Sequence, residues 1–240
     1  GFSGRTSDID LGVILSGPLR TSDVNRIKLS AGHSAVVDVA LPGRISIFWG
    51  SVDSINGFTD GGRFPPFDRL DLLESGLLLY GHDLRSELVR PQRRELLVSS
   101  GSFALKQFGS NASIEEFGDP ERIMSGGLVK MTKTVLFPAR FIYLEQTGQV
   151  ASNADAAAFY CANYSGPDAE LVARAMQWRS IPLPAPEKVK HLILQGLPPL
   201  YLRFLDIYKS RLWAWEESEI VMSLGRWRDR LAPLVLEANR

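Results

Sequence analysis

The sequence has a single cysteine, no excess of charge of either sign and no long apolar run. The lone cysteine, Cys161, excludes an internal disulfide and a cysteine-based zinc site, which fits the reducing cytoplasm. Because 27 Lys and Arg residues balance 27 Asp and Glu residues, no broad polyanion-binding surface is expected, and a nucleic-acid partner is disfavoured. No apolar run approaches the roughly 18 residues that a membrane span needs, so we expect no membrane partner.

Two aspartates open a segment of strand type. Asp8 and Asp10 are separated by one residue, Ile9, and an apolar stretch of strand type continues to Leu15. Residues two apart in a strand point to the same face, so both carboxylates would stand side by side, while Gly12 keeps that face small. Holding two carboxylates together is costly unless a hard cation lies between them, and Mg²⁺ is the usual one. The alternative is an ordinary edge strand that begins with solvated aspartates.

The residues around these aspartates carry a family resemblance. The segment Gly4–Leu11 (Gly-Arg-Thr-Ser-Asp-Ile-Asp-Leu) resembles the signature of the nucleotidyltransferase superfamily that includes polymerase beta, in its aminoglycoside 3''-adenylyltransferase and minimal types. The resemblance implies that Asp8 and Asp10 are catalytic ligands of Mg²⁺ and hold it against a nucleoside triphosphate, with ATP as the donor. It also implies nucleotide-binding roles for residues near them: Gly4, Arg5 and Ser7.

The resemblance is incomplete at its start. In the family, a Gly-Ser turn precedes the aspartates and grips the phosphates, and this chain has no match to it. We therefore expect a nucleotidyltransferase domain that is N-terminally incomplete. A helix, a first strand and the Gly-Ser turn would precede Gly1 in the natural protein, or be disordered or removed.

The next segments extend a small mixed sheet. A helix is predicted from about Thr21 towards Val39, followed by a strand over Arg44–Trp49 that is rich in β-branched and aromatic residues. The segment Arg63–Leu73 is similar to a segment of aminoglycoside adenylyltransferases in which an aromatic-Pro pair is followed by charged residues and a returning strand. Leu77–Gly81 is then predicted to form the last strand of the sheet.

A third carboxylate is missing from the place where many of these transferases have one. The resemblance puts it on the neighbouring strand, as a metal ligand or as the base that activates the acceptor hydroxyl, and Ser46 stands about there. The other candidates are Asp38, Asp53, Asp68 and Asp71. Otherwise the base comes from the helical part of the chain, or the chemistry is impaired.

From Arg93 the apolar residues recur at helical spacing. Asp119, Ser152 and Pro167 are typical of helix starts, and Gly148 is typical of a helix end. Proline is expected to kink or interrupt helices at Pro138 and at Pro198–Pro199. Short loops between these helices predict an antiparallel bundle.

Two features of the bundle bear on function. Ala139–Ser152 resembles a helix-turn of aminoglycoside 3''-adenylyltransferases, so the resemblance spans roughly residues 4–179. Lys130 and Lys133 lie on one helical face and could neutralise triphosphate charge, or could simply be solvated. An aminoglycoside acceptor would also call for acidic side chains, to which four residues could contribute: Glu115, Glu116, Asp119 and Glu145.

The last quarter of the chain contains two aromatic, amphipathic helical segments, Tyr201–Trp215 and Ile220–Leu234. Such stripes are far more often core or subunit interface than a cofactor site, and they could form a homodimer.

Together these features predict an α+β protein: residues 1–90 as a nucleotidyltransferase-like domain with a small mixed sheet, 91–180 as an all-α bundle and 181–240 as a C-terminal helical extension. The predicted activity is Mg²⁺-dependent transfer of a nucleoside monophosphate, AMP from ATP, to a hydroxyl of a small-molecule acceptor, which could be aminoglycoside-like. The alternatives are a catalytically degenerate binding protein of this fold and a transferase that modifies a protein partner.

Overall fold

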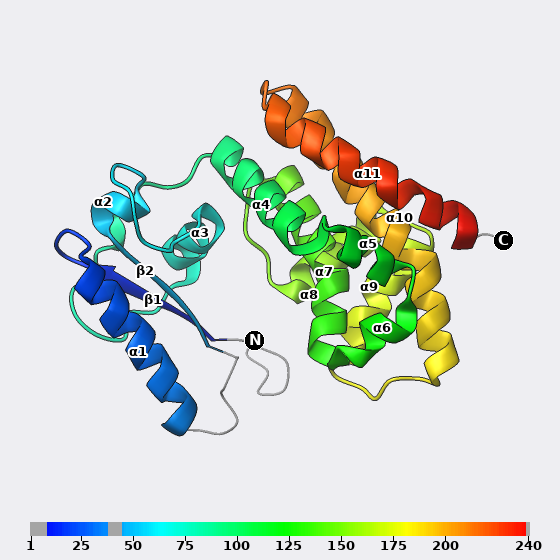
Figure 1. The fold of residues 1–240 in the computed structure, drawn as a ribbon, viewed down its shortest axis with the longest axis horizontal. Helices are drawn as coiled ribbons and strands as arrows, with labels where there is room; N and C mark the ends of the chain where they lie inside the picture. The colour runs from blue at the N-terminus through cyan, green and yellow to red at the C-terminus, as the bar shows by residue number, and fades with distance from the viewer. Residues whose placement is uncertain (1–8, 38–44, 239–240) are drawn as a thin grey trace. The chain divides into compact units, whose positions relative to one another are not determined.

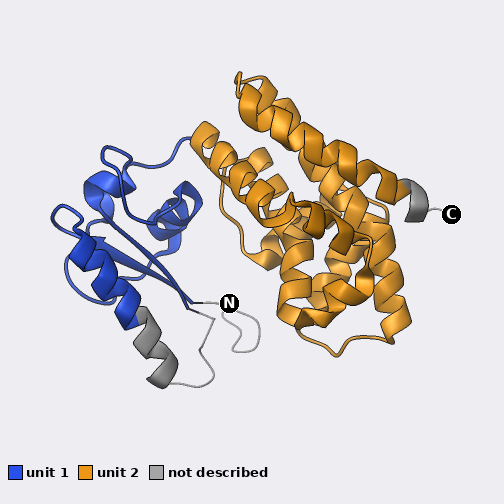
Figure 2. Ribbon diagram, in the orientation of Figure 1, with its two compact units in different colours: residues 1–92 blue, residues 93–240 orange. Residues whose placement is uncertain are grey.

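The computed structural model describes residues 9–37 and 45–238 of the chain. The chain divides into two compact units, Gly1–Gln92 and Arg93–Arg240 (Figure 2). The fold is mixed α+β, with its sheet in unit 1 and helices alone in the described part of unit 2. None of the helices within the described ranges combines the length and the apolar character that crossing a membrane requires.

Unit 1 is built on a parallel pair of strands, β1 (Ile9–Leu15) and β2 (Ile45–Ser51). Helix α1 (Thr21–Val37) follows β1 in the chain and packs on β2 (Figure 1). This is the crossover that a parallel pair needs. An isolated antiparallel bridge joins Trp49 to Arg63, so the chain returns along β2 for one residue only. The predicted helix and second strand are confirmed.

The rest of unit 1 differs from the expected sheet. The expected returning strand after the aromatic-Pro pair is wrong, because a helix, α3 (Pro66–Ser75), occupies that place. Proline at its first position and Asp68 in its first turn both favour a helix start. Two short helices complete the unit, α2 (Val52–Ile55) and η1 (Arg85–Glu87).

The predicted last strand, Leu77–Gly81, is also wrong. The described structure assigns no strand there, and Leu77, Leu79 and Tyr80 are 85%, 78% and 96% exposed. Arg85 fixes the two ends of this segment, since its guanidinium donates to the Gly76 carbonyl and to the Asp83 carboxylate. An apolar run that ends in an aromatic residue is compatible with a strand, but a strand also needs a neighbour to pair with.

Unit 2 is a bundle around one long helix. Its helices are α4 (Arg93–Phe108), α5 (Asn111–Phe117), α6 (Pro120–Ser125), α7 (Gly127–Thr147), α8 (Asn153–Asn163), α9 (Pro167–Trp178), α10 (Pro186–Trp213) and α11 (Ser218–Ala238). Helix α10 packs against α11, α9 and α7 (Figure 1). The segment expected as a C-terminal extension therefore lies in the same compact unit as the other helices.

The helix boundaries follow the predicted capping residues. Asp119 accepts a hydrogen bond from the Arg122 N–H at 3.1 Å, and Ser152 accepts one from the Asp155 N–H at 3.1 Å. Gly148 ends α7 in the left-handed region with φ 73°, which only glycine adopts without strain. These local predictions are confirmed because each cap involves neighbours in the chain.

The predicted interruption at Pro198–Pro199 is wrong, and of the kink or interruption expected at Pro138, the interruption does not occur. Pro138 lies inside α7, and Pro198 and Pro199 lie inside α10, which runs unbroken for 28 residues. An internal proline costs a helix about 3 kcal/mol. Pro138 and Pro198 are both buried, and the packing of each helix in the bundle offsets the lost hydrogen bond.

The aromatic residues of α10 and α11 form the core of unit 2. Tyr201, Phe204, Tyr208 and Trp227 are all fully or almost fully buried. The Tyr201 ring lies 4.5 Å from that of Phe117 on α5, and Phe204 lies 4.6 Å from Tyr208. These side chains hold the bundle together and are not available to a second chain. Of this aromatic segment, Trp213 remains exposed.

Two buried carboxylates join helices of unit 2. Asp168 on α9 accepts a hydrogen bond from the Tyr160 hydroxyl at 2.7 Å and one from Arg203 Nε at 2.8 Å. Burial, followed by the hydrogen bond to Asp168, raises the pKa of Tyr160, so its hydroxyl stays protonated and continues to donate. Glu145 on α7 accepts from Arg211 Nε at 2.7 Å and lies 3.5 Å from an Arg93 nitrogen.

We predict that Asp168→Ala destabilises unit 2 by about 2–3 kcal/mol, because it leaves the buried Tyr160 hydroxyl without an acceptor. The predicted loss is no larger because the other partner, Arg203, has a side chain that is 35% exposed and can turn to water. The matched control is Asp206→Ala, which removes a carboxylate paired with Arg228 at the surface and should cost at most about 1 kcal/mol. Urea unfolding measures both. Equal losses would contradict a structural role for the buried carboxylate.

Candidate functional site

The candidate site lies at the beginning of β1. Asp10 is exposed, and the parallel register places Ser46 of β2 directly beside it. Residues paired in this way project to the same face of the sheet. The next residues of that face are Gly12, paired with Phe48, and Ile14, paired with Gly50. The face therefore begins with two oxygen-bearing side chains and continues without any.

An aromatic cluster covers the sheet next to Asp10 and Ser46. A Cβ added to Gly12 would lie 3.3 Å from the Phe64 ring, so this glycine makes room for that ring. The Phe64 and Phe48 ring centroids are 5.8 Å apart, and the Arg63 guanidinium carbon lies 5.4 Å from the Phe48 centroid. Sequence reasoning missed Phe64. The glycine on the carboxylate face was the signal for a bulky neighbour.

Most of the predicted phosphate-side residues lie outside the described residues. These are Gly4, Arg5, Ser7 and the first aspartate, Asp8, together with the candidate third carboxylate Asp38. Asp10 is the one member of the predicted metal pair that the structure describes. The pairing of both aspartates on one face stays a prediction from their spacing in the strand.

The other candidates for a third carboxylate occupy helices. Asp53 lies in the first turn of α2, beyond the far end of β2. At about 3.3 Å per strand residue, that end is some 16 Å from Ser46, too far for one cation to contact both Asp10 and Asp53. Asp68 and Asp71 lie on α3 and remain candidates.

The two candidate lysines lie on α7 in unit 2. Lys130 Nζ donates to Glu116 Oε1 at 2.8 Å, and its side chain is 58% exposed. Lys133 lies one turn further along the same helix. A phosphate on Lys130 would compete with Glu116, and whether either lysine meets a nucleotide stays a prediction.

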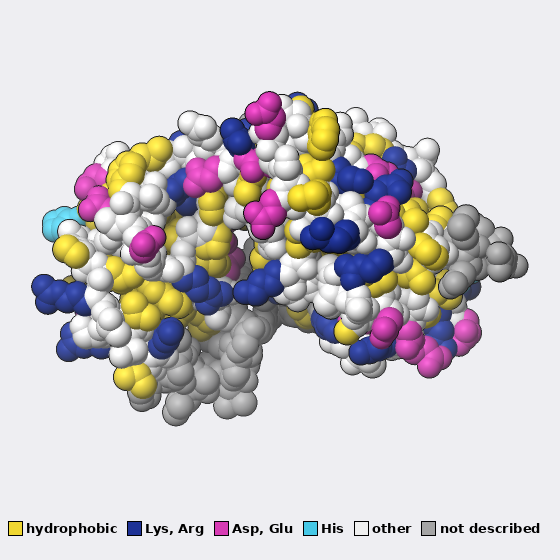
Figure 3. Space-filling view, turned by 45° about the horizontal axis from the view of Figure 1, so that its top comes forward, with side chains coloured by type: hydrophobic (Ala, Val, Ile, Leu, Met, Phe, Trp, Pro, Cys, Tyr) yellow, Lys and Arg dark blue, Asp and Glu magenta, His cyan; other side chains and the backbone are white. Residues whose placement is uncertain are grey.

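The expected acidic side chains for a polycationic acceptor are largely engaged elsewhere. Glu145 is buried and ion-paired with Arg211, so it is not available to an external ammonium group. Asp119 caps α6, and Glu116 binds Lys130. On the face drawn in Figure 3, basic and acidic side chains are intermixed over unit 2, in keeping with the zero net charge.

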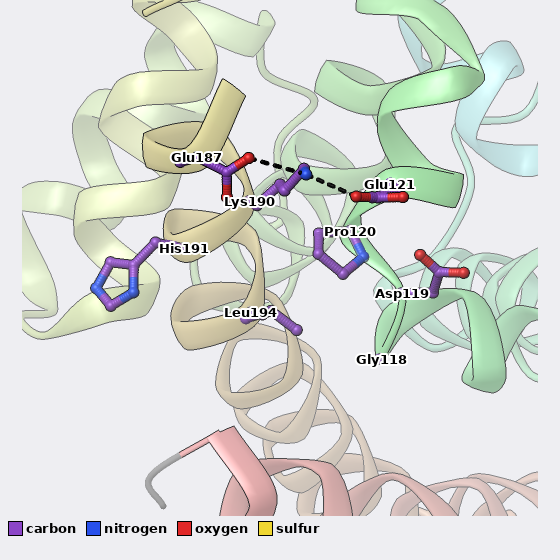
Figure 4. Close-up of a pocket in the computed structure, with 8 residues that line it drawn as sticks. All are labelled: Gly118, Asp119, Pro120, Glu121, Glu187, Lys190, His191 and Leu194. Carbon is purple, nitrogen blue, oxygen red and sulfur yellow. Dashed lines mark hydrogen bonds and ion pairs between the residues drawn. The ribbon is translucent and has the colours of Figure 1, made fainter. Parts of the chain in front are cut away.

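Unit 2 also carries a surface pocket of about 560 Å³ where α6 meets the first turns of α10 (Figure 4). Lys190 lies between two carboxylates, 2.6 Å from Glu121 and 3.0 Å from Glu187. These hydrogen bonds raise the pKa of Lys190. None of the predicted metal or nucleotide residues lines this pocket. Within the described ranges, no group of three or more His, Cys, Asp or Glu side chains is arranged to hold a metal ion.

Comparison with models of known protein families, with curated proteins and with solved structures finds no match to this chain.

We predict that Gly12→Val destabilises unit 1 by about 1–3 kcal/mol, because the added methyl groups meet the Phe64 ring. Valine itself favours a strand, so the loss would come from overpacking. Gly17→Val is the matched control, since a Cβ there meets nothing within 4 Å. Hydrogen exchange of the β1 and β2 amides in urea measures the effect. Equal exchange rates in the two variants would show that Phe64 does not cover Gly12.

Proposed function

We propose that this chain is a Mg²⁺-dependent nucleotidyltransferase that moves a nucleoside monophosphate, AMP from ATP, to a hydroxyl of a small-molecule acceptor. The observation that supports this best is the exposed Asp10 at the start of a strand, next to Ser46 of the neighbouring strand. The resemblance of the segment Gly4–Leu11 to the nucleotidyltransferase signature supplies the reaction.

The chemistry of the donor set fits Mg²⁺. The carboxylates of Asp8 and Asp10 and the hydroxyl of Ser46 are oxygen donors, the kind that Mg²⁺ prefers, and no nitrogen or sulfur ligand is among them. When bound, Mg²⁺ would neutralise charge on the triphosphate and on the leaving pyrophosphate. Asp8 and Asp10 would hold the ion at the start of β1.

The other proposed roles concern the substrates. Gly4, Arg5 and Ser7 would bind the triphosphate, and Lys130 and Lys133 would add positive charge to it. In this proposal an aminoglycoside-like acceptor would have to find its anionic partners outside Glu145, which is buried and ion-paired.

A second candidate function is a catalytically degenerate protein of the same family that binds a nucleotide without turnover. One observation favours it. The residue beside Asp10 on β2 is Ser46, and a neutral hydroxyl is not a general base for an acceptor at neutral pH.

We predict that ATP raises the melting temperature of the protein only when Mg²⁺ is present. At a concentration 100 times its Kd, a ligand of the native state adds about 2.7 kcal/mol of stability. The double variant Asp8→Asn/Asp10→Asn should lose this stabilisation, because it removes both proposed carboxylate ligands. The measurement is a thermal-shift titration with ATP, with and without Mg²⁺.

Asp60→Asn is the matched control, since it removes an exposed carboxylate from the loop after α2 and should respond to Mg-ATP as the unaltered protein does. Pyrophosphate release with a hydroxyl acceptor would favour the transferase over the degenerate protein. The absence of any shift with nucleoside triphosphates would overturn both proposals.

A further inference from the structure

The connector between α9 and α10 is held in an extended form by its own sequence. Proline at positions 182, 184 and 186 fixes φ, and each residue that precedes a proline is confined to extended backbone. Ala185, the last of these residues, has φ −52° and ψ 138°, as this rule predicts. At the other end, the Ile181 N–H donates to the Gln177 carbonyl at 2.9 Å. The connector is therefore stiff and fixed at both ends.

This connector forms one side of a surface cavity of about 590 Å³, and one face of α9 and the first two turns of α10 form the rest. The apolar residues that line the cavity are Trp178, Ile181, Pro182, Pro184 and Leu192. Cavities of this size, with apolar walls and a few polar groups, are typical of sites for small molecules. Because the connector is stiff, a ligand does not have to order it, which favours binding.

The charged side chains around the cavity leave one cation without a partner. Glu170 lies 3.8 Å from an Arg174 nitrogen. Glu187 lies 3.0 Å from Lys190 Nζ, so both carboxylates that line the cavity already have a basic partner. Lys188 lines the cavity as well, and within the described ranges it forms no ion pair. The charge that remains available to a ligand is therefore positive.

His191 adds a second donor to the same part of the cavity. It lies three residues after Lys188, on the same side of α10, and it also lines the cavity. Its ring points away from Lys190 and Glu121 (Figure 4). A histidine presents at least one ring N–H in either protonation state. The Lys188 ammonium and the His191 ring can therefore donate to one anionic group.

We propose that this cavity binds a small apolar anion, an aliphatic or aromatic molecule with one carboxylate. The apolar body lies against Trp178, Ile181 and Leu192, and the carboxylate accepts hydrogen bonds from Lys188 and His191. This inference goes beyond the proposed nucleotidyltransferase and does not rest on it, because none of the residues proposed to bind metal or nucleotide lines this cavity.

The probes are octanoate, octanol and octylammonium, which share one alkyl chain and differ in the charge of the headgroup. Binding to the full chain is followed by the chemical shifts of backbone amides in NMR spectra, which give both the location and Kd. We expect octanoate to bind most tightly and octylammonium most weakly. The shifts should saturate and should be largest at the amides of Ile181, Lys188 and His191.

Lys188→Gln tests the headgroup. It should weaken octanoate binding about fivefold, the effect of one unit charge at about 4 Å in a medium of high dielectric constant, and leave octanol binding unchanged. The variant should fold normally, because a cation in the first turn of a helix does not stabilise it. Lys106→Gln is the matched control, since Lys106 is an exposed lysine of α4 that does not line the cavity, and it should not change either Kd.

Ile181→Ser tests the apolar wall. It should weaken octanoate and octanol by the same factor, at least about threefold, because less apolar surface is buried against the alkyl chain. Ile181 is 52% exposed, so its replacement should not unfold the bundle. Leu183→Ser is the matched control: Leu183 lies in the same connector and is 40% exposed, but it is not among the residues that line the cavity.

Three results would overturn the proposal. The first is equal binding of octanoate and octanol, or an unchanged Kd of octanoate in Lys188→Gln. The second is tighter binding of octylammonium, which would assign the headgroup to Glu170 or Glu187. The third is a set of shifts that do not saturate or that lie away from the cavity. The double variant Asp8→Asn/Asp10→Asn should bind octanoate as the unaltered protein does, so failure of the metal site would leave this inference standing.

Discussion

The parallel register of β1 and β2 decides what stands beside Asp10. A shift of one residue would put Ile45 or Ile47 next to it and turn every side chain of β2 to the other face. Burial opposes such a shift, since Gly50 leaves space that Ile55 and Ser54 fill, and a Cβ there would lie 2.7 Å from Ile55. The aromatic contact of Phe48 with Phe64 depends on the same alignment.

This constraint also explains why the two ends of the face differ. Gly12 and Gly50 carry no side chain, so neighbouring groups approach the sheet closely and make its centre apolar. At the other end of the face, Asp10 is exposed. A polar end next to an apolar cluster is the arrangement of many ligand sites, in which apolar walls surround a few oriented polar groups.

Unit 2 obeys a different constraint, the burial of α10. Gly196 illustrates how close its neighbours come, because a Cβ there would lie 2.6 Å from both the Leu171 Cβ and the Pro167 carbonyl oxygen of α9. The buried carboxylate of Asp168 is satisfied by partners on two other helices, Tyr160 and Arg203. Unpaired, such a carboxylate would cost several kcal/mol.

Sequence reasoning succeeded where the physics is local. The caps at Asp119, Gly148 and Ser152 involve residues at most four apart, and their types alone predict them. It failed where distant contacts decide. Pro138 stays within a helix because of packing, and Leu77–Gly81 has strand composition without a pairing partner in the described structure.

The same difference between local and distant contacts applies to the candidate site. The strand that begins at Ile9 could be predicted from the alternation of its residues, and so could the exposure of Asp10. The position of Ser46 could be anticipated only approximately, because strand register depends on contacts across β1, β2 and Phe64 that no single segment contains.

The register also sharpens the choice between the two proposed functions. A transferase needs a group that takes the proton from the acceptor hydroxyl, and Ser46 cannot be that group. If the protein is an enzyme, the base comes from another residue, such as Asp68 or Asp71 on α3, from a residue outside the described part, or from unit 2. A binding protein needs no base, and for it the neutral Ser46 is no loss. A serine beside Asp10 is therefore compatible with metal and nucleotide binding, which two carboxylates can provide. Turnover requires one more group, a base, which this serine does not supply.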